Sequence, residues 1–414
     1  MVPEGWTETH LGEVITHQKG FAFNSGSYRD KGIRIVRISD TTRNSVHSEN
    51  PVYVTEEDAS ELERYKLTKD DIILSTVGSR PHLLDSMVGK AVKVPLEADG
   101  SLLNQNLVKI KPVTSKITNE YLYEMLKNKR FIFFISTLVR GNANQVSITL
   151  SDFFKYQFSL PPLPEQKKIA QILSTWDKAI TTTEQLLVNS QQQKKALMQQ
   201  LLTGKKRLLD ENGVRFSGEW KITTVSQMGK VVSGGTPDTN TKEYWDGDIH
   251  WLTPTDVTAL KSRFVRATTR TISEAGVQNS SATILPAGSL MVCTRATIGA
   301  LCISSGPICT NQGFKNIIPT KAFDVNFIYY LLAYNSKVLL RKASGSTFLE
   351  LPKKDFEKMA FPCPFLEEQQ RIAAVLSTAD EEIAALQQKL DALKQEKKAL
   401  MQQLLTGKRR VETN

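Results

Sequence analysis

Two arginines lie in corresponding parts of the chain, each just after a short apolar segment, and both are candidates for reading a base edge. Arg80 follows Thr76-Val77-Gly78-Ser79, and Arg295 follows a similar segment that ends at Thr294. Arginine is the side chain that most often donates two hydrogen bonds to the O6 and N7 atoms of guanine, so these positions favour contact with DNA bases. The alternative for each is a surface arginine or one held in an ion pair.

Two polar loops add candidates of the same kind. Asparagine and glutamine are suited to adenine, whereas lysine, serine and threonine contact bases or phosphates. The loop candidates are Arg140, Asn142, Asn144 and Gln145 in the first half, and Arg341, Lys342, Ser344, Ser346 and Thr347 in the second. Further DNA-binding candidates are Thr236, Lys242 and Thr297, with Lys19, Arg263 and Arg266 as phosphate contacts. Thr236 follows two glycines whose flexible backbone could approach a phosphate. A turn, a helix cap or solvated surface is the alternative for all of these residues.

The chain lacks the sequence patterns of enzymes that act on DNA. The only Pro-Pro pair, Pro161-Pro162, is not preceded by Asn or Asp, as the amine-holding loop of a methyltransferase requires. None of the Gly-Lys pairs is followed by Ser or Thr, so no Walker phosphate loop is present. A nuclease-like pattern runs from Asp152 to Glu165 and Lys167, but such short patterns recur by chance. The histidines show no metal spacing, so we expect neither an active site nor a metal site.

The composition is that of a globular protein with a polyanionic partner. The 414 residues carry a net charge of +10 and suffice for two or three domains with their own cores. The charge is uneven, because residues 1–164 contain 20 Lys and Arg against 19 Asp and Glu. The longest strongly apolar run, Phe131–Val139, is too short to cross a bilayer, and the N-terminus lacks the layout of a signal peptide. Four cysteines without a CxxC pattern fit a reducing cytoplasm best.

A mixed α/β domain must position the candidates of the first half. Short runs rich in β-branched residues and bounded by Gly, Asp or Pro predict strands. The predicted strands are Ile33–Ile38, Asp71–Thr76, Val88–Val94, Leu107–Lys111 and Tyr156–Leu160, and the predicted helices are Asn119–Lys127 and Arg130–Val139. The polar residues 141–145 form a loop after the second of these helices.

A segment of twelve residues occurs twice without change. Lys194–Lys205 returns as Lys397–Lys408, which indicates two halves that each end in this segment. Looser matches support the duplication; they pair Trp6 with Trp220, Leu67–Thr76 with Leu285–Thr294, and Asn104-Gln105 with Asn311-Gln312. The second half is therefore predicted to repeat the first fold with loops of different length.

A long helix is predicted at the end of each half. Residues 165–203 contain neither Pro nor Gly, with Pro164 just inside the start and Gly204 just past the end. Apolar residues in both helices recur by alternating steps of four and three, the period of a coiled-coil seam. The apolar seam residues are Ile169, Leu173, Trp176, Ile180, Leu187, Leu197 and Leu201, and then Ile372, Leu376, Ile383, Leu386, Leu390, Leu393, Leu400 and Leu404. Polar Thr183, Ser190 and Lys194 interrupt the first seam, where such residues often fix register or partner.

These elements predict an α+β fold with a pseudo-two-fold internal repeat. Residues 1–163 and 208–365 are expected to form two mixed α/β domains, separated by two long antiparallel coiled-coil helices at 164–207 and 366–410. The antiparallel arrangement follows because the chain ends of a domain usually lie close together. Two similar domains on a spacer suit duplex DNA with two separated half-sites, and their different loops predict half-sites of different sequence.

The chain resembles the specificity (S) subunit of Type I restriction–modification systems over essentially its whole length. The resemblance rests on the order of several motifs together with the duplicated helix. The motifs are Gly141-Asn142-Ala143-Asn144-Gln145, Leu160-Pro161-Pro162-Leu163-Pro164-Glu165-Gln166, Ser233-Gly234-Gly235-Thr236-Pro237, Trp245-Asp246-Gly247-Asp248-Ile249-His250-Trp251 and Thr294-Arg295-Ala296-Thr297-Ile298-Gly299.

The resemblance implies that residues 1–163 and 208–365 are two target-recognition domains of a non-catalytic subunit that reads bipartite double-stranded DNA. It also implies assembly with two methyltransferase (M) subunits and two restriction (R) subunits, with no membrane contact. The partners would use S-adenosylmethionine, ATP and Mg²⁺, and this chain would bind no cofactor. A coiled-coil scaffold that bridges two protein partners without reading DNA is the alternative from another class. A self-sufficient methyltransferase or nuclease is opposed by the missing motifs.

Overall fold

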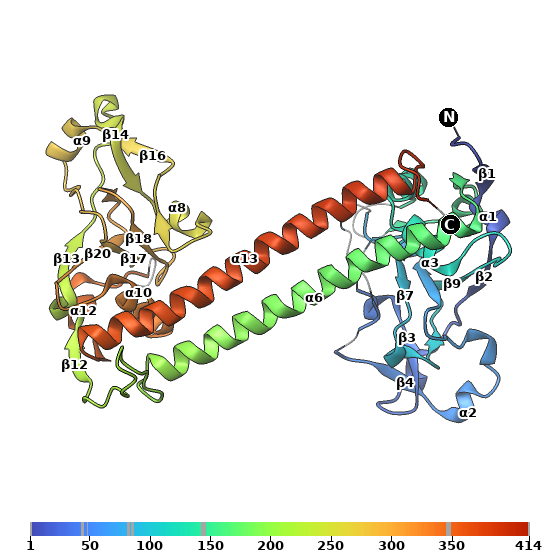
Figure 1. Cartoon of the computed structure of the whole chain (residues 1–414), viewed down its shortest axis with the longest axis horizontal. Helices are drawn as coiled ribbons and strands as arrows, with labels where there is room; N and C mark the ends of the chain where they lie inside the picture. The colour runs from blue at the N-terminus through green and yellow to red at the C-terminus, as the bar shows by residue number, and fades with distance from the viewer. Residues whose placement is uncertain are drawn as a thin grey trace. The chain divides into compact units, whose positions relative to one another are not determined.

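The chain forms two units, each of which combines distant parts of the sequence. The computed structural model describes residues 2–42, 45–47, 49–80, 83, 87–141, 146–344 and 349–412. Unit 1 comprises Met1–Glu184 with Lys389–Asn414, and unit 2 comprises Gln185–Gln388. The long helices α6 (Leu163–Leu201) and α13 (Leu366–Leu404) each contribute one segment to each unit. They are the green and red helices of Figure 1.

Unit 1 contains a main antiparallel sheet, a smaller sheet and two ribbons. Its strands are β1 (Thr7–His10), β2 (Ile15–Lys19), β3 (Ile33–Val36), β4 (Val52–Val54), β5 (Ile72–Ser75), β6 (Val77–Gly78), β7 (Ala91–Lys93), β8 (Leu102–Leu103), β9 (Leu107–Pro112), β10 (Val146–Ser147) and β11 (Gln157–Leu160). Its short helices are α1 (Leu11–Val14), α2 (Glu56–Ala59), α3 (Asn119–Leu126), α4 (Lys129–Leu138) and α5 (Leu150–Phe153). The main sheet has the order β2-β9-β5-β7, the smaller sheet has the order β4-β3-β8, and the ribbons are β1-β11 and β10-β6.

Unit 2 repeats this arrangement with longer loops. Its strands are β12 (Lys221–Thr224), β13 (Gly229–Ser233), β14 (Trp245–Leu252), β15 (Phe264–Val265), β16 (Arg270–Ile272), β17 (Leu290–Cys293), β18 (Leu301–Ser304), β19 (Cys309–Thr310), β20 (Phe314–Pro319) and β21 (Ala360–Cys363). Its helices are α7 (Val225–Met228), α8 (Pro254–Ala259), α9 (Glu274–Gln278), α10 (Val325–Tyr334), α11 (Ser336–Lys342) and α12 (Lys353–Lys358). Its sheets have the orders β13-β20-β17-β18-β15 and β16-β14-β19, and β12 pairs with β21.

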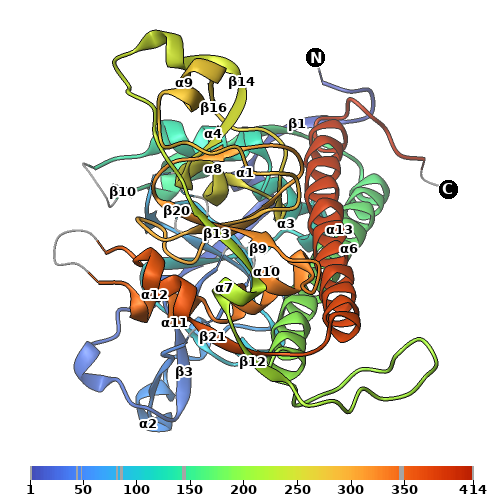
Figure 2. The same cartoon turned by 90° about the vertical axis from the view of Figure 1, so that its left-hand side faces the viewer.

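The two sheet orders correspond strand by strand, so the fold is present twice. The order β2-β9-β5-β7 matches β13-β20-β17-β18, and β4-β3-β8 matches β16-β14-β19. In both smaller sheets the central strand has one antiparallel and one parallel neighbour. Figure 2 shows that the smaller sheet of unit 2, with α9, lies at the end of the unit opposite to the ribbon of β12 and β21. The predicted α+β class with an internal repeat is confirmed.

A strand buried on both faces divides the core of each domain. In β5, Ile72 and Leu74 pack against α3 and α4, whereas Ile73 packs into a second cluster with Val36 and Leu103. Neighbouring residues of a strand point to opposite faces, so with a cluster on each face all four residues of β5 are buried. In β17, Leu290 and Val292 face one cluster while Met291 and Cys293 face another. The same division occurs in both units.

The long helices end at Leu201 and Leu404, a few residues before the predicted bounds of 207 and 410. Each has 39 residues and is followed by a glycine with positive φ, at 69° for Gly204 and 68° for Gly407. A left-handed glycine is the usual helix stop, because it turns the chain without a Cβ clash. The Lys206 amide then donates to the Gln200 carbonyl over 3.0 Å, and Arg409 repeats this bond to Gln403 over 3.1 Å.

Within each unit the two helix segments run antiparallel. In unit 1, Lys397 of α13 contacts Asp177 of α6 at 2.5 Å, and Lys394 contacts Glu184 at 2.7 Å. Residue numbers fall along one helix as they rise along the other, which is the signature of an antiparallel pair. Unit 2 follows the same rule: Lys194 pairs with Asp380, and Ser190 donates to Glu382 over 3.0 Å.

Candidate nucleic-acid interface

The ends of the long helices are part of the domain cores. In unit 1, Ile169 and Leu173 from the start of α6 join Leu404 and Leu405 from the end of α13 in the main cluster. In unit 2, Leu201 and Leu202 join Ile372 and Leu376 in the equivalent cluster. The remaining seam positions are buried or half-buried; they are Trp176, Ile180, Leu187, Leu197, Ile383, Leu386, Leu390, Leu393 and Leu400. Each recognition domain is therefore anchored to both helices.

In each unit, hydrogen bonds among a triad of an arginine, a glutamate and a tryptophan join segments that are distant in the sequence. In unit 1, Arg410 donates two hydrogen bonds to Glu165, of 2.8 and 2.9 Å, and Trp6 donates a third of 2.9 Å. In unit 2, Arg207 donates to Glu368 over 2.6 and 2.7 Å, and Trp220 donates over 3.2 Å. The carboxylates are almost fully buried, with 5% of the Glu165 and 3% of the Glu368 side chain exposed.

The triads assign a structural role that sequence analysis did not predict for these residues. Burial opposes ionisation of Glu165, but the hydrogen bonds from Arg410 and Trp6 outweigh it and lower the pKa of this carboxyl. The signal in the sequence was an arginine after each helix stop and a glutamate in the first turn of each helix. Both arginines pair with the glutamate at the start of the opposite helix.

A polar cluster also joins the helices to each domain. In unit 1 the side chain of Lys397 is 8% exposed, and its ammonium group lies 3.3 Å from Glu124 of α3 as well as against Asp177. Burial raises the pKa of Glu124, and the nearby lysines oppose this effect. In unit 2 the hydroxyl of Tyr330 donates to Asp380 over 2.6 Å, and Asp380 also accepts from Lys194.

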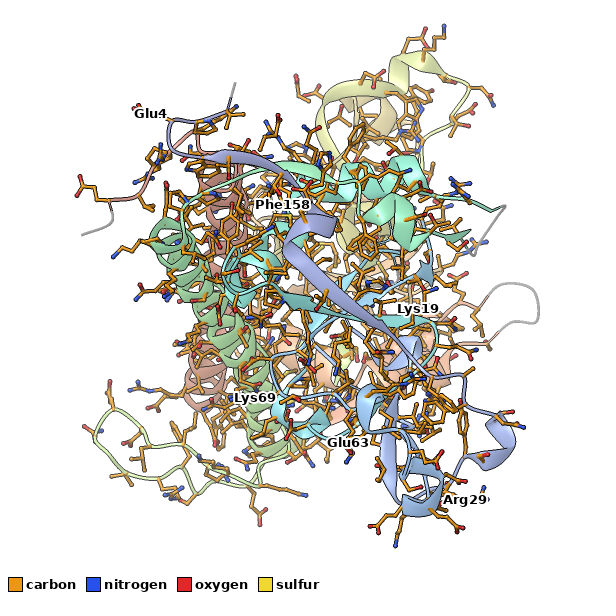
Figure 3. The ribbon with its side chains drawn as sticks, turned by 90° about the vertical axis from the view of Figure 1, so that its right-hand side faces the viewer. Glu4, Lys19, Arg29, Glu63, Lys69 and Phe158 are labelled. Atoms are coloured by element: carbon orange, nitrogen blue, oxygen red, sulfur yellow. The ribbon has the colours of Figure 1, made fainter. Side chains whose placement is uncertain are left out.

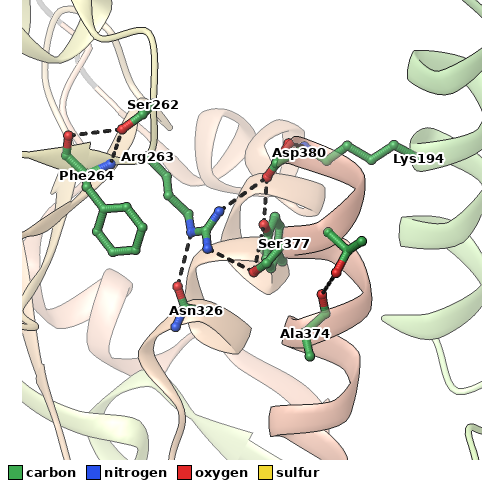
Figure 4. Close-up of polar contacts among 10 residues, drawn as sticks. Lys194, Ser262, Arg263, Phe264, Asn326, Ala374, Ser377 and Asp380 are labelled. Atoms are coloured by element: carbon green, nitrogen blue, oxygen red, sulfur yellow. Dashed lines mark hydrogen bonds and ion pairs between the residues drawn. The ribbon is translucent and has the colours of Figure 1, made fainter. Parts of the chain in front are cut away.

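Arg263 belongs to the cluster of unit 2 and is turned into the unit. Figure 4 shows its guanidinium among Asn326, Ser377 and Asp380. It donates to Asn326 over 3.1 Å and to Ser377 over 2.9 Å, and lies 3.7 Å from Asp380. Its side chain is only 13% exposed. The interpretation of Arg263 as a phosphate contact is therefore wrong, because these internal partners hold its charge.

The candidate residues of unit 1 lie on exposed loops. Arg80 is exposed after β6, and Lys19 is exposed at the end of β2 (Figure 3). Arg140 is 66% exposed, and its guanidinium pairs with Asp152 at 2.7 Å. Hydrogen bonds from Thr149 and then Lys155 lower the pKa of Asp152 further. The remaining loop candidates, Asn142, Asn144 and Gln145, lie outside the described residues.

The candidates of unit 2 are only partly brought together. Thr236 donates a hydrogen bond to Gln312, and Gln312 lies beside Arg295 in one hollow of about 540 Å³. The hollow is lined by Pro254, Arg295, Ala296, Asn311, Gln312, Gly313 and Leu349. Lys242 is exposed away from the hollow, in a short helical turn before β14, and Thr297 and Lys342 are exposed as well. Ser346 and Thr347 lie outside the described residues.

The two glycines before Thr236 are required by close packing rather than by flexibility. A Cβ atom on Gly234 would lie 1.8 Å from the carbonyl oxygen of Asn311, and one on Gly235 would lie 2.3 Å from the backbone of Ser281. In unit 1 a Cβ atom on Gly20 would likewise lie 2.0 Å from the carbonyl oxygen of Asn104. Asn104-Gln105 and Asn311-Gln312 served only as repeat markers in the sequence. The structure shows that the second pair helps to form the hollow.

The nuclease-like pattern does not form a free carboxylate site. Asp152 is held by Arg140, Lys155 and Thr149, and Glu165 belongs to a triad. Among the residues that the structure describes, no group of three or more His, Cys, Asp or Glu side chains is placed to hold a metal ion. Within the same residues, no helix is long and apolar enough to cross a membrane.

A chain with two copies of one mixed domain and paired long helices has a known counterpart. One family model, the Type I restriction modification DNA specificity domain, matches residues 3–189 and again residues 217–395. The chain therefore belongs to the family of type I restriction–modification specificity subunits. The general role of this family is DNA target recognition in assembly with partner subunits.

Individual relatives agree with this assignment. The MjaIX specificity subunit of Methanocaldococcus jannaschii is 39% identical over 165 residues, which are 39% of this chain and 38% of that relative. The MjaX subunit of the same organism is 25% identical over 422 residues, which cover this chain completely and 95% of the relative. The S subunit from M. genitalium shares the fold, with a TM-score of 0.62, 15% identity, and coverage of 98% of this chain and 99% of that one.

Proposed function

We propose that the chain is the non-catalytic subunit that selects the DNA sequence for a type I restriction–modification enzyme. Its target would be bipartite and asymmetric, with one half-site for each unit. The observation that supports this best is that corresponding positions of the repeated fold carry different side chains. Arg295 forms a backbone bridge with Glu350 in unit 2, whereas Val77 occupies the corresponding place opposite Ser147 in unit 1. One scaffold thus presents two different sets of reading groups.

The proposal extends to the partners. Two methyltransferase subunits and two restriction subunits would assemble on the chain, since a repeated surface presents the same contact twice. The exposed residues of the duplicated segment support this view, because Gln199 and Gln200 recur as Gln402 and Gln403 although all four are exposed. S-adenosylmethionine, ATP and Mg²⁺ would be bound by the partners rather than by this chain.

Selection from random DNA tests the proposal. The chain would be purified with its methyltransferase partner and incubated with a pool of random duplexes, and the bound fraction would be sequenced. We expect enrichment of a motif with two specified parts and an unspecified gap. A complex that assembles but enriches no gapped motif would favour the scaffold alternative. Methyl transfer by the chain alone would refute its non-catalytic role.

A further inference from the structure

The hollow of unit 2 presents hydrogen-bond donors from two loops. Arg295 contributes its guanidinium, which has donors only. The side-chain oxygen of Asn311 accepts from the amide of Gly313 over 2.9 Å, which leaves the amide nitrogen as the group that Asn311 can offer. The side-chain oxygen of Gln312 accepts from Thr236 in the same way, and its nitrogen remains. The internal hydrogen bonds therefore occupy the accepting oxygens of both amides.

The backbone around Arg295 is fixed on both sides. Thr294 donates its amide and its hydroxyl to the carbonyl of Gly313, over 2.8 and 3.2 Å, and accepts from the amide of Leu351 over 2.8 Å. Ala296 has φ of 62°, a conformation that residues with a Cβ rarely adopt. Such conformations persist where the surrounding structure enforces them, and they cluster at binding sites. The backbone of Arg295 is therefore held in place at the edge of the hollow by its two neighbours.

We propose that this hollow binds the major-groove edge of a guanine in the half-site read by unit 2, and that Arg295 specifies that base. The inference rests on the proposed function and adds a base and a residue to it. Guanine presents two acceptors there, O6 and N7, which match a set of donors. Adenine and cytosine each present an amino donor on that edge, and thymine presents a single acceptor beside a methyl group. A donor-rich hollow therefore favours guanine over the other bases.

The repeat supplies a comparison within the same molecule. In unit 1 the position of Arg295 is taken by Val77, whose side chain cannot donate a hydrogen bond. Arg80 lies three residues beyond it and does not occupy the corresponding place. The guanine contact is therefore specific to one half-site, and Arg295→Val converts the position to the residue that the other unit uses.

The test compares variants of the complex with the methyltransferase partner in selection from random duplexes. We expect wild type to enrich a guanine at one fixed position of one half-site. Arg295→Val should reduce discrimination for that guanine by roughly tenfold to hundredfold, with the rest of the motif retained. Arg295→Lys should lose most of the discrimination too, because lysine lacks the planar fork. Lys261→Ala removes an exposed positive charge of the same unit outside the hollow; it is the charge-matched control and should leave the motif unchanged.

Other outcomes would overturn the inference. A uniform loss of affinity without a change of motif would make Arg295 a phosphate contact. An unchanged guanine preference in a folded Arg295→Val complex would exclude a reading role. The lysine variant, which keeps the charge and length, covers the case in which the valine variant fails to fold. Failure of wild type to enrich any gapped motif would instead refute the proposed function, so the two failures can be distinguished.

Discussion

Glu165 and Glu368 each join distant segments of one unit, although the sequence offers a function for Glu165 only through a chance nuclease-like pattern and marks none for Glu368. Each carboxylate accepts three hydrogen bonds from a tryptophan and an arginine that come from different parts of the chain. The folded state tolerates a buried carboxylate whose hydrogen-bond partners are in place. Removal of one partner destabilises the fold, because it leaves a buried charge without compensation. The triads are therefore the places where single substitutions should have the largest effect outside the apolar core.

Arg207→Ala should destabilise unit 2 by about 2 kcal/mol, because it leaves the buried carboxylate of Glu368 without its charged partner. For a domain of this size, that loss lowers the midpoint of thermal unfolding by roughly 4–8 °C. Lys206→Ala removes an exposed charge one residue earlier and is the matched control, for which we expect a change close to zero. Equal melting curves for the two variants would show that the triad contributes little.

The depressed pKa of Glu165 predicts a dependence of stability on pH. The folded chain holds this carboxyl ionised below its ordinary pKa of 4.5, so the stabilisation is fully present above pH 4.5. It is lost as the pH falls through the folded pKa. Glu165→Gln should remove this part of the dependence, so the urea midpoints of wild type and variant should converge between pH 5 and pH 3. A constant difference across that range would contradict the assignment.

The long helices illustrate which elements the sequence could predict. Freedom from Pro and Gly over 165–203, with Gly204 beyond, predicts a helix that the structure places at Leu163–Leu201. Helices 119–127 and 130–139 and strand 107–111 also lie within a few residues of their predicted bounds. The ribbon of β1 and β11 escaped prediction, because it pairs Thr7 with Leu160 and no local pattern signals a partner so distant.

The candidate site was harder to predict than the fold. Arg263 and Arg295 carry the same guanidinium group. Only the tertiary structure places Arg263 against Asn326 inside the unit and Arg295 in the lining of a hollow. The hollow itself is built from segments around residues 254, 295, 311 and 349. Their meeting depends on strand order, which residue types and spacing do not specify.

The helix pair suggests how the gap between half-sites could be changed. One heptad added to both α6 and α13, after Glu184 and after Gln388, preserves the seam and the contacts within each unit. If the helices set the gap, seven residues at ~1.5 Å each should lengthen it by about three base pairs of ~3.4 Å. The gap is read from the enriched motif. The same insertion in α6 alone is the control, and it should destabilise the helix pair rather than lengthen the gap. An unchanged gap with both insertions would show that the helices do not set the distance between the half-sites.

The repeat predicts that the recognition domains can be exchanged independently. Replacement of residues 208–365 by the corresponding segment of a relative should change one half-site and leave the other, because the readers of unit 1 are untouched. The segment contains Trp220 but neither Arg207 nor Glu368, so the incoming domain must bring a tryptophan at this place to complete the triad. Selection on the hybrid complex gives both half-sites at once. A change in both would contradict separate readers.

The composition of the units also fixes the order in which the chain can fold during synthesis. Unit 2 is complete once residue 388 has left the ribosome, although its domain follows the other in the sequence. Unit 1, made first, still lacks Leu404 and Leu405 of its core and the Arg410 partner of Glu165. Pro3 of unit 1 also lacks its packing partner Gly407 at that stage. The first domain to emerge is therefore the last to close, and a chain released just after residue 388 has a complete unit 2 and an incomplete unit 1.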